Sequence, residues 1–576
     1  MSRDTNSTTT TAADVSARTN AVADTADHAC DLQQICTARH WSIYWLLIFC
    51  SLAMISGRVM TLNHDADPYG MSKADAPFFS ANDRSRWCTV RSLGDHGKYE
   101  IDDVISDPGN RFNWDTIDKV MHVGSDGQLH AYSSKPPLFP TIVAGLYQVI
   151  KQLTGKTITE DTTFVVRTIL FLVNVVPWAL YLWFLAKLLE LIPARDWAKY
   201  FVVACAGFGT FLSTFSITLN NHSIAAVSVV AALYGLTRIA MGNKANKYFW
   251  LVGFAAAFAT ANELPALSFL AFAGVVCFVK SPVRTILGLV PAAAVVAAAF
   301  FGTNYLAHDD WRPPYAHRGD GAKFAELRGD FEDQLSKGDL PKELLSAADG
   351  RYDILNMTVE PAMWPGWGVS ATNFTAAKRW IAKNDRLQQF TIVKVEDVEN
   401  PKWQLHEWDN WYDYPGSYWL TTNQQKSNVD LGQTSREVYA FHILFGHHGI
   451  FSLTPLWLLS LAGMFVLLFQ SRFQMRWFAL MTIVISVVVV AFYIERPAHD
   501  RNYGGWTSGL RWLFWLAPLW LVSMVPIVEW LGKSSRGRMC CYGLLLISAL
   551  SASYSLGNPW VHPWLFEIWD LSGLPK

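Results

Sequence analysis

Hydrophobic residues along the chain are gathered into long runs separated by polar stretches. A bilayer is crossed by roughly 20 mostly apolar residues in helical conformation, and runs of about that length recur along the whole chain. The runs cover residues 41–57, 163–186, 199–218, 223–241, 247–262, 265–281, 284–305, 447–470, 476–494, 510–531 and 538–556. The pattern predicts an all-α polytopic membrane protein with about eleven transmembrane helices.

A further apolar stretch, residues 138–150, is too short to cross the bilayer. It follows the polar segment SSKPPL and ends at Lys151. We expect a surface or re-entrant amphipathic helix there.

Positive charges in the short loops predict which side of the membrane each loop occupies. Lysine and arginine gather at residue 39 and in the loops 187–199, 238–247, 280–284, 472–476 and 533–538. By the positive-inside rule this side is cytoplasmic. The N-terminus is then cytoplasmic, and the run from residue 41 is an uncleaved membrane anchor.

These assignments divide the chain into seven parts. Polar, Thr-rich composition predicts a disordered cytoplasmic tail over 1–40, and the long polar loops fall outside the cytoplasm. The later parts are the first transmembrane helix (41–57), a first extracytoplasmic loop with catalytic and juxtamembrane helices (58–162), a transmembrane bundle (163–305), a Trp-rich extracytoplasmic insertion of mixed structure (306–439), a C-terminal bundle (440–556) and an extracytoplasmic tail (557–576).

Composition supports this class and argues against others. Of 576 residues, 51% are hydrophobic and only 16% charged, and the net charge of −1 gives no support for a nucleic-acid partner. Almost no ionisable residue falls in the middle of a predicted span, whereas ion-coupled transporters usually carry theirs near the midplane. The cysteines have no zinc-binding spacing and form no disulfide framework.

The unusual polar clusters all fall on the predicted outer side. They are SANDRSRW (80–87), SSKPPL (133–138), LNNHS (219–223), ANELP (261–265), FGHHGIF (445–451) and ERPAHDRNYGGWTSGLRW (495–512). Any chemistry is therefore expected at the outer face of the membrane.

Two of these clusters suit a phosphate ligand. Pro136 and Pro137 stiffen the chain beside Lys135 and can begin a helix, so Lys135 is either a snorkelling anchor or a ligand for a headgroup phosphate. Arg511 follows a glycine-rich turn that lets backbone approach a ligand, and its guanidinium suits phosphate.

The other clusters have structural and functional interpretations side by side. Asn82 and Asp83 can cap a following helix, and the arginines beside them can be solvated. Glu263 can pair structurally or bind a sugar hydroxyl or a metal, and adjacent histidines are weak evidence for a metal. The candidates for sugar or acceptor contacts are Asn221, His222, Glu263, His447, His448, Asn502 and Tyr503.

The first outer loop resembles the membrane glycosyltransferases of the GT-C superfamily, which include protein O-mannosyltransferases and lipid A aminoarabinose transferases. The resemblance covers roughly residues 41–200 and rests on Asp83, on Arg86-Trp87, on DHGKY (95–99) and on the Lys-Pro-Pro motif that precedes the next helix. This chain departs from the family pattern at Arg84 and Ser134, where the family often has acidic residues. Donor sugar and acceptor are therefore not carried over.

The resemblance implies a GT-C-like fold and an inverting transfer from a polyprenyl-phosphate sugar to an acceptor hydroxyl. Asp83 would be the general base, and Lys135, Arg84, Arg86 and Arg511 would bind the donor phosphate. The resemblance implies no particular cofactor beyond the donor substrate, and a divalent metal is left open. The partners would be the lipid-linked donor, membrane lipids and an acceptor protein, lipid or glycan, in a bacterial inner membrane with the active site extracytoplasmic.

Three alternatives share parts of this pattern. A transporter or flippase of a lipid-linked saccharide would need the phosphate site but no base. A non-catalytic GT-C-like scaffold would need neither. An outer-face hydrolase would use Glu263 with His447 or His448, although the chain has no nucleophile-elbow or metal motif.

Overall fold

The computed structural model describes most of the chain from residue 40 onward. The described residues are 40–62, 80–107, 114–361, 379–395, 402–419, 426, 428–470 and 473–573. The tail predicted over 1–40 lies outside them, apart from residue 40.

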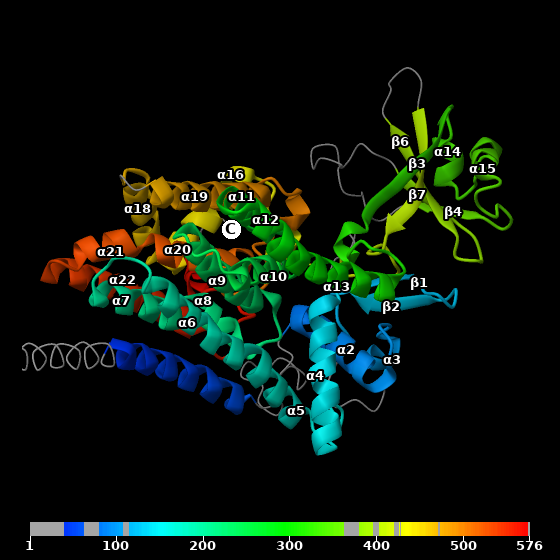
Figure 1. Ribbon diagram of the computed structural model, residues 1–576. Helices are drawn as coiled ribbons and strands as arrows, with labels where there is room; N and C mark the ends of the chain where they lie inside the picture. Colours follow the sequence, from blue (N-terminus) through cyan, green and yellow to red (C-terminus); the bar gives the residue numbers. More distant parts are fainter. Residues whose placement is uncertain are drawn as a thin grey trace, which may run out of the picture.

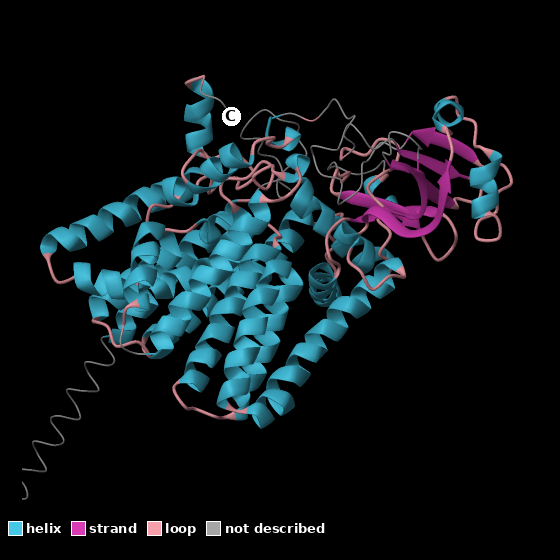
Figure 2. Ribbon diagram, turned by 90° about the horizontal axis from the view of Figure 1, so that it is seen from above, coloured by secondary structure: helices cyan, strands magenta, loops and turns pink. Residues whose placement is uncertain are grey.

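Long apolar helices form a bundle that makes up most of the molecule (Figures 1 and 2). Within the described residues, six helices are long and apolar enough to cross a membrane. They are His40–Thr61, Thr162–Leu189, Asp196–Ile217, Asn221–Ala240, Pro282–His308 and Met475–Ile494. A seventh span arises if Arg511–Ser523 and Val525–Leu531, bent by 45° at their junction, count as one. This is the architecture of a multi-pass membrane protein.

Among the described residues the structure shows six of the eleven expected spans, or seven with the bent pair, because the other apolar runs form helices that are shorter, broken or less apolar. The run 447–470 divides at Thr454 and Pro455 into α17 (Ile450–Leu453) and α18 (Trp457–Leu468). Proline lacks a backbone N–H and interrupts the helical hydrogen-bond ladder. The other runs outside the six are α10 (Asn246–Asn262), η3 (Leu264–Ala266) with α11 (Leu267–Lys280), and α22 (Ser535–Tyr554).

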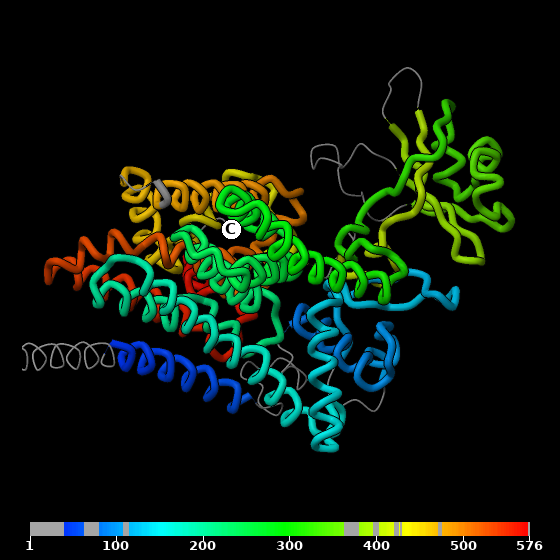
Figure 3. Tube along the Cα trace, viewed as in Figure 1, coloured from blue at the N-terminus to red at the C-terminus, as the bar shows by residue number. Residues whose placement is uncertain are grey.

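Several of the long spans are composed of consecutive labelled elements. Figure 3 follows the chain through them. The elements are α5 (Thr162–Leu170), η1 (Phe171–Val175), α6 (Val176–Leu189), α7 (Asp196–Phe208), α8 (Phe211–Thr214), η2 (Phe215–Ile217), α9 (Asn221–Ala240), α12 (Pro282–Arg284), η4 (Thr285–Leu289), α13 (Val290–His308), α19 (Phe473–Ile494), η8 (Arg511–Leu516), α20 (Ala517–Ser523) and α21 (Val525–Leu531).

The described residues of the predicted first outer loop include two packed helices and a hairpin. Helix α2 (Ala81–His96) packs against α4 (Leu138–Thr154), and a side chain at Gly94 would overlap the Tyr147 ring. Helix α4 covers the stretch expected at the membrane surface and is not among the spans above. Between the two helices lie α3 (Asp102–Ile105) and the antiparallel pair β1 (Lys119–Val123) and β2 (Leu129–Ser133).

The predicted mixed insertion contains a five-stranded antiparallel sheet that projects from the bundle (Figures 1 and 2). Its strand order is β3-β7-β6-β5-β4, and Phe390, Trp403 and Leu344 are buried in its core. Its elements are β3 (Arg318–Arg328), α14 (Glu332–Ser336), α15 (Lys342–Ala348), β4 (Thr358–Pro361), β5 (Arg379–Lys383), β6 (Gln389–Val395) and β7 (Lys402–Asn410).

The chain returns from the insertion to the bundle and ends beside it. The remaining elements are η5 (Pro314–Ala316), η6 (Asn428–Leu431), α16 (Arg436–Leu444), η7 (Ala498–Asp500) and α23 (Trp564–Leu571). Helix α23 lies in the segment predicted to be a simple tail.

Candidate functional site

A cavity of about 1240 Å³ opens where the first outer loop, the bundle and the insertion meet. Its wall is contributed by the start of α2, the segments around Asp118 and Lys135, the start of α9, the α10–η3 turn, the start of β3, residues 488–512 and the C-terminal segment. Most of the outer polar clusters singled out from the sequence therefore contribute to one space.

One part of the wall is basic. Lys135, Arg86 and Arg511 all line the cavity, although they lie far apart in the sequence. Burial and the nearby charge of Arg511 together lower the pKa of Arg86 to about 10. Neighbouring cations repel one another unless an anion lies between them. We call Lys135, Arg86 and Arg511 the basic pole.

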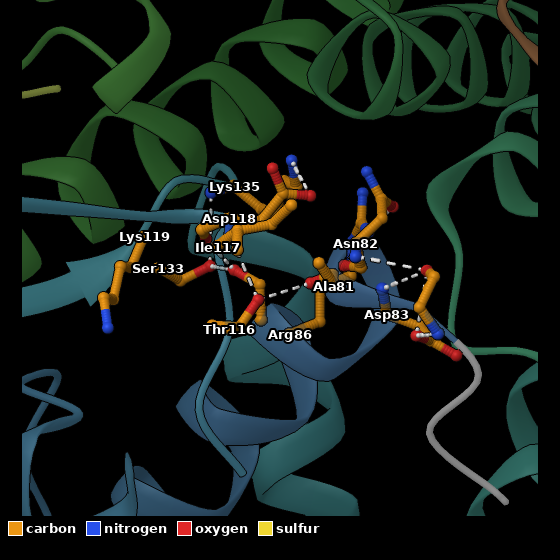
Figure 4. Close-up of polar contacts among 12 residues, drawn as sticks. Ala81, Asn82, Asp83, Arg86, Thr116, Ile117, Asp118, Lys119, Ser133 and Lys135 are labelled. Carbon is orange, nitrogen blue, oxygen red and sulfur yellow. Dashed lines mark hydrogen bonds and ion pairs between the residues drawn. The ribbon is translucent and has the colours of Figure 1, made fainter. Parts of the chain in front are cut away.

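Asp118 supplies an anion at this pole. Its carboxylate is 2.9 Å from Lys135 Nζ, and the two side chains are only 11% and 18% exposed (Figure 4). Burial alone would raise the pKa of Asp118, but Lys135, Arg511 and Arg86 outweigh it and hold the pKa below its ordinary value. Burial lowers the pKa of Lys135 to about 8 against the pull of Asp118. Asp118 is thus an ionised carboxylate facing the cavity.

The hairpin places Asp118 beside Lys135. Strand β1 begins directly after Asp118 and pairs with β2, with Lys119 opposite Ser133. The Ser134 backbone N–H then donates to the Asp118 carbonyl at 3.1 Å. The register of this pair therefore brings together two residues that are 17 positions apart in the sequence.

A hydrogen-bond network ties the two arginines of the basic pole together. Arg86 donates to the side-chain oxygen of Asn221, and Asn221 Nδ2 donates to Glu263 at 2.7 Å. Glu263 also accepts from His222 Nδ1, and Arg511 Nη1 lies 2.9 Å from His222 Nε2. Because Arg511 can only donate, this geometry assigns His222 the neutral form with its proton on Nδ1.

Local structure explains why this network forms. Asn220 caps α9 by accepting from the Ser223 backbone N–H at 3.0 Å, so Asn221 and His222 are held at the first turn. The clusters LNNHS and ANELP are thus joined in the cavity wall, where Asn221 and His222 donate to Glu263. The network orients Arg86 and Arg511 toward the cavity.

A backbone carbonyl also holds the Arg511 side chain in place. Its Nε and Nη2 donate to the Gly504 carbonyl at 3.2 and 2.9 Å. Gly504 has φ 93°, a left-handed conformation that glycine adopts without strain. The glycine-rich turn therefore holds the arginine by a carbonyl. The expected helix N-terminus at this point is the short 3-10 helix η8, which offers no extended row of free N–H groups.

Aromatic faces make up much of the remaining wall. Trp419, Trp506, Trp512, Trp560 and Tyr412 all line the cavity. Aromatic rings with polar edges suit ligands that present both C–H faces and hydroxyl groups. Charged groups and aromatic faces in one cavity are typical of a site for a charged saccharide.

Asp83, the predicted base, is not among the residues that line the cavity. It is the third residue of α2, where its Oδ1 accepts from the Ser80 and Arg84 backbone N–H groups at 2.8 and 2.9 Å. This is a capping box, so the capping interpretation is confirmed, with Ser80 rather than Asn82 as the N-cap. Figure 4 shows Asp83 at the cap, away from Asp118 and Lys135.

The other predicted residues divide between the cavity and its surroundings. Asn502 lines the cavity, as do Asn221, His222 and Glu263. Arg84 does not; its Nη1 donates to the Asp115 carbonyl at 3.0 Å. His447, His448 and Tyr503 lie outside the lining and pack together in a buried cluster, where the His448 ring stacks on Tyr503. Burial in this cluster favours a structural role for the two histidines.

Sequence reasoning missed several lining residues. Asp118 belongs to no recognisable sequence motif. Only the pairing register of a short hairpin indicates that it lies beside Lys135. Arg496 and Asp500 belong to a cluster that was singled out, but they were given no role. Arg318 and the C-terminal residues Trp560 and His562 were not considered, because they reach the cavity only through the fold.

In the described parts of the chain, no group of three or more His, Cys, Asp and Glu side chains is arranged to hold a metal ion. No family model matches the sequence, and no curated protein matches it at a significant level. The geometry of the cavity therefore carries the functional argument.

Proposed function

We propose that this protein is an inverting glycosyltransferase that moves a sugar from a polyprenyl-phosphate donor to an acceptor hydroxyl at the outer face of a bacterial inner membrane. The supporting observation is the basic pole, where Lys135, Arg86 and Arg511 meet in a cavity that is also lined by aromatic rings. A lipid-linked donor suits a protein whose described residues include six helices long and apolar enough to cross a membrane. The GT-C resemblance of the first loop agrees with this class.

The basic pole would bind the donor phosphate. Arginine and lysine form charge-assisted hydrogen bonds with phosphate oxygens, and the fork of Arg511 is already oriented by Gly504 and His222. The same groups would stabilise the negative charge that develops on the phosphate as the sugar leaves.

Asp118 would act as the general base in place of Asp83. The acceptor oxygen attacks the anomeric carbon and forms the new C–O bond, while the bond from that carbon to the phosphate oxygen breaks. The acceptor proton passes to the Asp118 carboxylate, and polyprenyl phosphate leaves with the bonding electrons. No strong general acid is needed, because phosphate is a good leaving group.

Donor binding would also prepare the base. Lys135 holds Asp118 in an ion pair of 2.9 Å. A donor phosphate competes for Lys135 and weakens that pair, which raises the basicity of Asp118. The carboxylate is thus most reactive when a donor is present.

The proposal is tested with purified protein in proteoliposomes that contain radiolabelled polyprenyl-phosphate sugars, with envelope extract as acceptor. Wild type should release polyprenyl phosphate, and Lys135→Gln should weaken donor binding by about one to two orders of magnitude, the loss of a charge-assisted bond to phosphate. Lys151→Gln is the matched control, since Lys151 lies on α4 and pairs with Asp95 outside the cavity lining.

Two outcomes would contradict the proposal. Donor binding that is unchanged in Lys135→Gln would remove the phosphate site. Transfer of intact lipid-linked saccharide across the bilayer without release of polyprenyl phosphate would favour a flippase.

A further inference from the structure

A second basic group lines the same cavity and takes no part in the donor site. Arg318 lies at the start of β3, and Arg496 follows α19. Both pair with one carboxylate: Asp500 lies 3.5 Å from Arg318 Nη1 and 3.2 Å from Arg496 Nη2. Two guanidinium groups thus share one anion. We call Arg318, Arg496 and Asp500 the second pole.

The second pole is largely removed from water. The side chains of Arg318, Arg496 and Asp500 are 15%, 17% and 11% exposed. Among the described residues, Arg318 Nε is buried without a hydrogen-bond partner. Buried guanidinium groups are costly unless anions offset them.

Aromatic rings hold the two arginines in place. The Arg318 guanidinium lies 4.0 Å from the ring centre of Tyr412, and that of Arg496 lies 5.4 Å from Trp512. Such stacking fixes the plane of each guanidinium. Tyr412 and Trp512 also line the cavity, so a ring-shaped ligand would meet aromatic faces and cations together.

The second pole lies close to the proposed base. Burial opposes the charge of Arg318, but Tyr412, Asp500 and Asp118 outweigh it and raise its pKa. The negative charge of Asp118 therefore contributes to the raised pKa of Arg318. A group bound at Arg318 would hold its neighbouring hydroxyls within the same cavity as the base.

We infer that the second pole is an acceptor site for a saccharide that carries an oxyanion, either a carboxylate or a phosphate. This inference rests on the proposed function and deepens it by naming the class of acceptor. Asp500 presents a carboxylate to both arginines, as Asp118 does to Lys135 at the basic pole. The acceptor site joins two parts of the molecule, because Arg318 comes from the insertion and Arg496 from the bundle.

The test measures sugar binding to the full-length protein in nanodiscs saturated with polyprenyl phosphate, which occupies the basic pole. Glucose, glucuronate and glucose 6-phosphate are titrated by calorimetry. The two charged sugars should bind about tenfold more tightly than glucose, since each additional charge-assisted contact is worth about one order of magnitude. Preference for one of them alone also supports the inference and identifies the oxyanion.

Variants separate a binding role from a structural one. Arg318→Gln and Arg496→Gln should abolish the preference for charged sugars, and Arg318→Lys should retain part of it. Asp500→Asn should increase the affinity for charged sugars about tenfold, because a competing anion is removed. Arg312→Gln is the control, since Arg312 is exposed and pairs with Asp310 and Asp409 outside the cavity lining.

Equal binding of glucose and the charged sugars would overturn the inference, as would a preference that survives in both Arg318→Gln and Arg496→Gln. Weaker binding of charged sugars in Asp500→Asn would also overturn it. The proposed function is judged separately, by whether polyprenyl phosphate binding depends on Lys135. Failure of the inference and failure of the proposed function are therefore distinguishable.

Discussion

Two acidic residues of the first outer loop, Asp83 at the start of α2 and Asp118 before β1, show how differently one side chain behaves in two settings. Both are buried: counted over the whole residue, Asp83 is 0% exposed and Asp118 8%. Burial raises the pKa of Asp83 to about 6, and its hydrogen bonds with Ser80 and Arg84 only partly oppose this. Asp118 experiences the same burial, but Lys135 outweighs it and lowers the pKa. A charged partner, rather than depth of burial, decides which of the two carboxylates has a lowered pKa.

The largest effect is expected from breaking the pair at Asp118. Lys135→Ala leaves a buried carboxylate without its nearest cation, and we expect a loss of about 3 kcal/mol in the free energy of unfolding. The double variant Lys135→Ala/Asp118→Ala should recover much of it, because no orphaned charge remains. Chemical unfolding in mild detergent, followed by tryptophan fluorescence, measures both. A double variant as unstable as Lys135→Ala would contradict this account of the pair.

The raised pKa of Asp83 should make stability depend on pH. The folded state binds this proton more tightly than the unfolded state, whose pKa is near 3.8. Stability from this group is therefore full below about pH 4 and is lost as pH rises toward 6, by about 2 to 3 kcal/mol. Asp83→Asn should remove this decline. Unfolding curves between pH 4 and 7 test it, and an unchanged slope in the variant would assign the pH dependence to other groups.

The smallest effect concerns the cap itself. The Ser80 hydroxyl accepts from the Asn82 backbone N–H at 3.1 Å and from that of Asp83 at 3.4 Å. Ser80→Ala should cost about 1 kcal/mol in the free energy of unfolding, and Ser80→Gly only a few tenths. Neither should alter turnover by more than the loss of folded protein. A selective loss of turnover in Ser80→Ala would instead connect the cap of α2 to the chemistry.

Local features of this chain could be predicted from the sequence, because they depend on neighbouring residues. The capping role of Asp83, the helix that begins after Pro137 and the cap at Asn220 each involve a few consecutive positions. Lys135 and Arg511 were also correctly expected at one place, since both clusters fall at the same predicted side of the membrane.

Features that depend on contacts across the fold could not be predicted. Asp118 reaches Lys135 through the register of β1 and β2, and no local pattern encodes that register. Arg318 and Asp500 are 182 positions apart and meet only because the insertion returns to the bundle. The apolar run 447–470 divides into two helices for a related reason. Hydropathy counts apolar residues, whereas the break at Thr454 and Pro455 depends on backbone conformation.

The comparison between the two carboxylates is tested most directly by substituting each with asparagine. Release of polyprenyl phosphate is measured in proteoliposomes, with donor binding followed in parallel. Asp118→Asn should lower turnover by about 10²- to 10⁴-fold, the contribution of a general base, while donor binding is retained. Asp83→Asn should retain turnover within about threefold, because an asparagine can still accept the capping hydrogen bonds. The opposite result, with turnover lost in Asp83→Asn and retained in Asp118→Asn, would contradict the account and return the catalytic role to Asp83.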